Sequence, residues 1–202
     1  MNYSAPLYLA SSSRSRKELL ELAQIPFSLA VQSADESLYN WKQNPEDLVI
    51  TLARAKMDAV VMPEISDCFI LTADTICVDL KGTIHGKPEN HDDAIRMLTL
   101  WKQGSWVLTG FCLERRHKKE MSWTTIAKTE GVVTTKIEFS VPDEFLEEYL
   151  RKTPSFECAG AMAIEGYGFQ FVQSIQGSYS NIIGLPMYEV REALNTLGFF
   201  VP

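Results

Sequence analysis

Hydrophobic residues along the N-terminal third of the chain switch from strand-like to helical spacing. An apolar run at residues 7–10 ends in three serines, and the next apolar residues follow a helical period. This pattern predicts a strand, a polar turn and a helix of about ten residues, marked by Leu19, Leu20, Leu22 and Ala23. A second helix is predicted from Pro45, with acids at 46–47 where the helix dipole favours them. Its expected core stripe is Leu48, Leu52, Ala55 and Ala59.

The middle of the chain predicts a sheet with antiparallel strands. Residues 69–78 form a β-type apolar run that is broken by one acid, Asp74. After a turn at Lys81-Gly82, a helix is expected over 92–101. Long strands are then expected over 106–113 and 125–139, joined by a charged turn at 115–120. The second of these strands alternates apolar or small residues with polar neighbours, at Val133, Thr135, Ile137 and Phe139.

The C-terminal third combines helices with glycine-rich turns. Ser140, Pro142 and Asp143 together predict a capped helix start, and Pro186 predicts the start of the last helix. Glycines between these helices let the backbone approach a ligand closely, at Gly160, Gly166, Gly168, Gly177 and Gly184. No repeat or linker interrupts the pattern. We therefore expect residues 1–202 to form one α/β domain, a mixed twisted sheet flanked by helices.

Composition narrows the functional classes. The net charge of -7 opposes binding to a polyanion, which argues against a nucleic-acid partner. Four widely spaced cysteines predict neither a zinc site nor a disulfide framework, and they suit a cytoplasmic protein. No apolar run approaches the roughly 20 residues that a bilayer crossing needs, so no membrane partner is expected.

The first candidate for chemistry is the turn SSSRSRK at residues 11–17. It leads into a helix N-terminus with three cations, which the helix dipole disfavours unless an anion compensates them. A phosphate group would meet that need. The alternative is an ordinary helix start, with Ser15 and Glu18 as a capping box and solvated cations.

Asp74 is the second candidate, because a carboxylate in an apolar strand is costly unless it is paired, protonated or metal-bound. Such an acid can hold a divalent ion or take a proton from an attacking water. The alternative is a solvent-facing position at a strand edge.

Four further charged residues are weaker candidates. Lys87 stands between a glycine and a proline that would aim its ammonium, and Lys56 lies on the edge of a helix stripe. Either lysine alone is more commonly a surface residue. Asp35 and Glu36 form either a solvated acidic loop or a source of a second metal-binding carboxylate.

Taken together, four short blocks resemble the Maf family in order and spacing, over nearly the whole chain. They are LASSS (9–13) with RKELL (16–20), LARAK (52–56), ADT (73–75) with GKP (86–88), and AG (159–160) through IEG (164–166) to SNIIGLP (180–186). The resemblance implies a fold like that of inosine triphosphate pyrophosphatases, with a deep cleft, and a homodimer. It also implies an enzyme that cuts a nucleoside triphosphate into monophosphate and pyrophosphate.

The resemblance implies a role for each site residue. Ser11 and Arg16 would hold phosphate oxygens, and Lys56 and Lys87 would neutralise developing charge. Asp74 would act as the base on water and would bind the metal together with Glu36. Oxygen ligands favour Mg²⁺ or Mn²⁺ as that metal. The remaining substrate-binding positions would be Ser13, Ser15, Thr75 and Glu165.

Departures from the family pattern affect which nucleotide base is expected to bind. The family's usual turn is Ser-x-Ser-Pro-Arg-Arg. In this chain Arg14 stands at the proline position and Ser15 at the first arginine position. Ser15 and Glu165 stand where the dTTP/UTP branch has arginine and glutamine, and Glu165 resembles the 7-methyl-GTP branch. A carboxylate accepts hydrogen bonds from a guanine edge, as that substrate requires. Thr75, in contrast, matches the pyrimidine branch, so dTTP or UTP is the alternative substrate.

Two other functional classes share some of these features. A nucleotide-sensing regulator of cell division or septum formation would need the phosphate turn, but not Asp74, Glu36 and both lysines together. Their joint occurrence favours catalysis. A P-loop kinase or ATPase is rejected, because no G-x-x-x-x-G-K-[ST] motif occurs and a proline follows Lys87.

Overall fold

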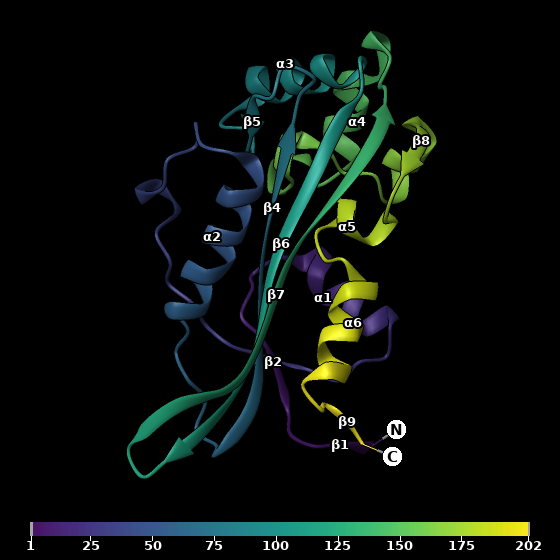
Figure 1. Ribbon diagram of the computed structural model, residues 1–202. Coiled ribbons are helices and arrows are strands. Elements are labelled where there is room, and N and C mark those ends of the chain that lie inside the picture. The colour runs from purple at the N-terminus through teal and green to yellow at the C-terminus, as the bar shows by residue number, and fades with distance from the viewer. Residues whose placement is uncertain (1, 202) are drawn as a thin grey trace.

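The computed structural model describes residues 2–201, in which helices cover both faces of a long central sheet (Figure 1). Helix α2 lies on one face, while α1 and α6 lie on the other. The elements follow in the order β1 (Asn2–Tyr3), β2 (Leu7–Leu9), α1 (Arg14–Leu22), β3 (Ser28–Leu29), the 3₁₀ turn η1 (Glu36–Leu38), α2 (Pro45–Asp58), β4 (Asp67–Val78), β5 (Ile84–His85), α3 (His91–Trp101), β6 (Ser105–Lys119), β7 (Ser122–Phe139), η2 (Asp143–Phe145), α4 (Leu146–Lys152), η3 (Ser155–Glu157), η4 (Ala159–Ala161), η5 (Gly166–Phe171), β8 (Val172–Gln176), α5 (Tyr179–Ile183), α6 (Met187–Thr196) and β9 (Phe200–Val201).

The central sheet is mixed, as the sequence predicted. Its strand order is β3-β2-β4-β6-β7-β8. Strand β2 runs parallel to both β3 and β4, whereas β4, β6, β7 and β8 pair antiparallel. The short strand β5 pairs with the far end of β4. The predicted α/β class with a mixed sheet flanked by helices is confirmed.

A gap in strand pairing along one edge of β4 positions the site. Strand β2 pairs with β4 only as far as Leu9 opposite Leu71, and β5 begins only at His85 opposite Cys77. Between these points β4 carries residues 72–76 past the serine turn that follows β2. Ligands of open α/β sheets bind beyond the carboxyl ends of strands, where neighbouring chains diverge in this way.

Close packing brings α2 onto the sheet beside this gap. A Cβ added to Gly110 of β6 would lie 2.6 Å from the main-chain oxygen of Val49, so only glycine allows this approach. The buried face of α2 includes Ala53, Lys56 and Met57. The predicted stripe members Ala55 and Ala59 are only half-buried, because the helix packs on a face rotated from the expected one.

Two predicted local features are wrong. The charged turn expected at 115–120 is part of strand β6, which continues to Lys119 because charged side chains on this hairpin pair with neighbours. Arg115 bonds to Asp67 at 2.9 Å, for example. The cap expected from Ser140 is absent: η2 starts after Pro142 with no side-chain cap, and α4 begins only at Leu146. Proline supplies the fixed φ that starts the turn without a capping hydroxyl.

Within the described residues 2–201, no helix combines the length and apolar character needed to cross a membrane.

Candidate functional site

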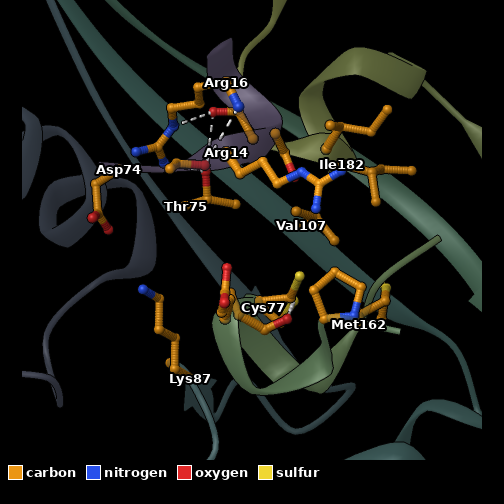
Figure 2. A pocket seen from close by; sticks show the side chains of 18 of the residues that line it. Arg14, Arg16, Asp74, Thr75, Cys77, Lys87, Val107, Met162 and Ile182 are labelled. Carbon is orange, nitrogen blue, oxygen red and sulfur yellow. Dashed lines mark hydrogen bonds between the residues drawn. The ribbon is translucent and has the colours of Figure 1, made fainter. Parts of the chain in front are cut away.

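A cleft of about 950 Å³ opens beside the unpaired edge of β4, and Figure 2 shows it from close by. Its walls come from the serine turn and α1, from α2 and β4, from the loop after β5, and from the segments around 154–167 and 182–184. All the site residues predicted from the sequence line this one cleft: Ser11, Ser13, Ser15, Arg16, Glu36, Lys56, Asp74, Thr75, Lys87 and Glu165.

Arg16 is a buried cation at the inner end of the cleft, with 7% of its surface exposed. Its Nε donates to the main-chain oxygen of Gly184 at 2.7 Å, and its Nη2 donates to Thr75 Oγ1 at 2.9 Å. Its Nη1 donates to Ser11 Oγ at 3.2 Å. Burial lowers the pKa of the guanidinium from its ordinary value, while the negative charge of Asp74 opposes that shift. These hydrogen bonds hold the guanidinium of Arg16 in one orientation before any ligand binds.

The serine turn combines a structural role with the cleft wall. Ser13 is the N-cap of α1, and its hydroxyl accepts from the main-chain N–H of Arg16 at 3.4 Å. The alternative capping box of Ser15 and Glu18 is wrong, because Glu18 instead accepts from Arg14 Nε at 2.6 Å. The first turn of α1 contains no acidic residue, so its N-terminus keeps a positive potential toward the cleft.

Asp74 and Lys56 form a buried ion pair across the β4–α2 contact. Lys56 Nζ donates to Asp74 Oδ1 and lies 2.8 Å from Glu36 Oε1. Asp74 and Lys56 are 6% and 7% exposed, so both surface alternatives are wrong for them. Burial raises the pKa of the Asp74 carboxyl, and the positive charges of Lys56 and Arg16 oppose this shift. A raised pKa suits a carboxylate that accepts a proton near neutral pH.

Glu36 reaches the same cluster from the 3₁₀ turn η1. Asp35 caps that turn, because its carboxylate accepts from the main-chain N–H of Ser37 at 3.0 Å. Its carboxylate therefore stabilises the loop. Glu36 itself is 45% exposed and faces Lys56. Among residues 2–201, no group of three or more His, Cys, Asp or Glu side chains converges as a metal site. Glu36 and Asp74 nevertheless place two hard oxygen donors on either side of the Lys56 ammonium.

Lys87 lies on the opposite wall, in the loop that follows β5. Figure 2 shows its ammonium extended into the cleft on the side of Asp74. The side chain is exposed, but the main chain before it is fixed, because Gly86 O accepts from Gly160 N at 2.7 Å. The structure therefore brings Lys87 to the cleft as an unburied cation, in contrast to Lys56.

The outer end of the cleft is lined by a different set of side chains. Ser15 Oγ donates to Glu165 Oε2 at 3.3 Å, and burial raises the pKa of the Glu165 carboxyl. Nearby, Lys152 Nζ lies 4.4 Å from the centre of the Tyr167 ring. Apolar residues that also line the cleft are Cys77, Val107, Met162, Ile164 and Ile182.

Sequence reasoning gave several of these contributors no specific contact or did not name them as site residues. Gly184 accepts from Arg16 and has a φ of +117°, and a Cβ there would lie 3.3 Å from Thr75 Oγ1. It belongs to the glycine cluster noted in the sequence, which was the available signal. The apolar residues come from strands β4 and β6, helix α5 and the segment around 162–164, and no spacing in the sequence joins them.

Comparison with known proteins gives a consistent family relationship. Residues 6–197 match the family model described as Maf-like protein. A nucleoside triphosphate pyrophosphatase of Prochlorococcus marinus is 37% identical over 206 residues, covering 95% of this chain and 97% of the relative. A dTTP/UTP pyrophosphatase of Geotalea uraniireducens is 38% identical over 204 residues, covering 98% of each chain. A dTTP/UTP pyrophosphatase of Halalkalibacterium halodurans is 37% identical over 196 residues, covering 96% and 97%.

Proposed function

This chain belongs to the Maf family, and we propose that it hydrolyses a nucleoside triphosphate to nucleoside monophosphate and pyrophosphate. The main observation behind this proposal is the buried Asp74–Lys56 ion pair, which lies beside the guanidinium of Arg16, itself held by hydrogen bonds. Phosphoryl and nucleotidyl transfer depend on positioned cations and an oriented nucleophile more than on covalent chemistry. The names of the relatives support the same reaction.

The cations of the cleft would bind the phosphates. Arg16 and Ser11 hold phosphate oxygens at the N-terminus of α1, where the dipole adds to the attraction. Lys87 approaches from the other wall and neutralises charge on the pyrophosphate as it leaves. Asp74 takes a proton from water as the water oxygen attacks the α-phosphorus. The bond from the α-phosphorus to the bridging oxygen breaks, and the electron pair leaves with pyrophosphate.

A divalent metal fits the carboxylates at this end. Glu36 and Asp74 both contact Lys56 Nζ, so two hard oxygen donors lie close enough together to share one cation. Mg²⁺ and Mn²⁺ accept one or two carboxylates and complete their coordination with water and phosphate oxygens. When bound, such an ion would neutralise phosphate charge. Two protein carboxylates would leave the remaining coordination positions to water and to phosphate oxygens.

For the base, we propose a guanine-type ring such as that of 7-methyl-GTP. Glu165 is a half-buried carboxylate at the outer end of the cleft, and it can accept hydrogen bonds from the N1–H and amino group of guanine. Ser15 is too small to block that edge. The second candidate is dTTP or UTP, which the names of two relatives and the presence of Thr75 favour.

Three associated proposals complete this picture. The four cysteines are free thiols, which supports a cytoplasmic location. A homodimer follows from the family resemblance and is measured by sedimentation. A nucleotide-sensing regulatory role is the remaining alternative, in which the cleft binds nucleotide without cleaving it.

The deciding experiment measures pyrophosphate release with Mg²⁺ or Mn²⁺ from 7-methyl-GTP, GTP, dTTP, UTP, CTP and ITP. Preferential cleavage of 7-methyl-GTP supports the guanine proposal, whereas preferential cleavage of dTTP and UTP supports the second candidate. If the folded protein binds these nucleotides but releases no pyrophosphate from any of them, the catalytic proposal fails and the nucleotide-sensing regulatory role is favoured instead.

A further inference from the structure

Trp41 connects two loops that line the cleft. Its Nε1 donates to the main-chain oxygen of Glu36 at 3.4 Å. Its ring lies over Gly86, where an added Cβ would be 3.2 Å from Cη2 and 3.3 Å from Cζ3 of the indole. One side chain therefore touches the residue that carries a cleft carboxylate and the residue that precedes Lys87.

The indole is itself held by the body of the protein. Trp41 is half-buried and packs against a cluster of buried residues from α2, β4 and β6, namely Val49, Ile76, Val78 and Leu108. The neighbouring Leu38 is 79% exposed and gives the loop no such support. Gly86 is fixed from behind by its bond to Gly160. Trp41 is thus an apolar anchor between the turn η1 and the start of α2.

We propose that Trp41 is a positioning residue that clasps the Glu36 loop to the Lys87 loop and so presets the metal-binding carboxylate. Trp41 lines the edge of the cleft but acts through Glu36 and Gly86. The inference rests on the metal and phosphate roles proposed above for Glu36 and Lys87. Because Glu36 is 45% exposed, a loop without this anchor would lose more conformational entropy when the carboxylate binds an ion.

The direct test is Mn²⁺ affinity, measured by electron paramagnetic resonance on the whole protein without nucleotide. Trp41→Ala is expected to weaken Mn²⁺ binding on the order of tenfold, as loss of an outer support of a metal ligand does. Trp41→Phe keeps an aromatic ring in the loop but loses both the N–H and the Cη2 and Cζ3 atoms that contact Gly86, so only part of the affinity should return. The matched control is Trp106→Ala, which removes a tryptophan that is 39% exposed on β6, and it should bind Mn²⁺ like the wild type.

A second measurement does not depend on how well the alanine variant folds. The chain has four tryptophans, so the protein labelled with 5-fluorotryptophan gives resolvable ¹⁹F signals, and Trp41→Phe assigns one of them. In the otherwise wild-type protein, Mg²⁺ should shift the Trp41 signal and leave that of Trp123 in place. An unmoved Trp41 signal at saturating Mg²⁺, or wild-type Mn²⁺ affinity in Trp41→Ala, overturns the clasp. Failure to release pyrophosphate would instead count against the proposed reaction, because both metal readouts are made without turnover.

Discussion

The inner and outer ends of the cleft differ in how firmly their polar groups are held. At the inner end, Arg16 donates to three oxygens and Lys56 bridges two carboxylates, all beside an interior strand. At the outer end, Ser15 and Glu165 share one hydrogen bond of 3.3 Å, and Ser15 is partly exposed. The contrast indicates that the end proposed for chemistry is preorganised, whereas the end proposed for base selection can change with few side chains.

Removing the carboxylate at the inner end should have the largest effect. Asp74→Asn keeps the shape of the side chain but removes the proposed base, so kcat should fall on the order of 10²- to 10⁴-fold. Steady-state pyrophosphate release measures this loss. Asp67→Asn is the matched control, because Asp67 starts the same strand and pairs with Arg115. Retention of near wild-type kcat by Asp74→Asn would remove Asp74 from the mechanism.

Replacing Arg16 at the inner end should lower both activity and stability. Arg16→Lys keeps the charge but cannot satisfy Ser11, Thr75 and Gly184 at once, so kcat/KM should fall about 100-fold. A buried acceptor left without a donor costs about 1–3 kcal/mol of unfolding free energy, measured by urea denaturation. Arg191→Lys, at an exposed pair with Glu192, should change neither quantity. A stable and fully active Arg16→Lys would show that the guanidinium of Arg16 is not needed.

Changing the outer end should alter selection and leave chemistry intact. Glu165→Gln replaces an acceptor by an amide that also donates, which should shift the kcat/KM ratio of 7-methyl-GTP to dTTP toward dTTP by roughly 10- to 100-fold. The nucleotide panel measures that ratio. The kcat for the better substrate should stay close to the wild type. A uniform fall for every nucleotide would place Glu165 in the general machinery of the site.

The smallest effect concerns pH at the outer end. Burial raises the pKa of Glu165 above its ordinary 4.5, so protonation begins at higher pH than for an exposed glutamate. Below that pKa the carboxyl no longer accepts as an anion, so KM for a guanine nucleotide should rise several-fold as pH falls through it. KM for dTTP should follow a flatter course. Glu165→Gln should abolish the difference, and parallel pH profiles for both nucleotides in the wild type would contradict this account.

Local sequence patterns predicted the inner end better than the outer end. The apolar run around Asp74 indicated a carboxylate with a special environment, and the structure buries it as that pattern implied. The cations of α1 lie at a helix N-terminus, where the helix dipole disfavours positive charge, so their position alone indicated a compensating anion such as phosphate. In contrast, the wall formed by Val107, Met162 and Ile182 could not be predicted, because ordinary apolar residues from distant segments carry no local signal. The Trp41 contact with Gly86 also depends on loops that only the fold brings together.

The sequence alone determined the mixed α/β class, most helices and strands, and the family resemblance, because these depend on periodicity and on short motifs. Tertiary structure decided how long β6 and β7 run, since their charged ends are held by pairing with neighbours such as Asp67. It also decided which face of α2 is buried, because Gly110 lets that helix lie close against the sheet. That packing buries Lys56 against Asp74, which turned a residue predicted on a helix edge into half of an interior ion pair.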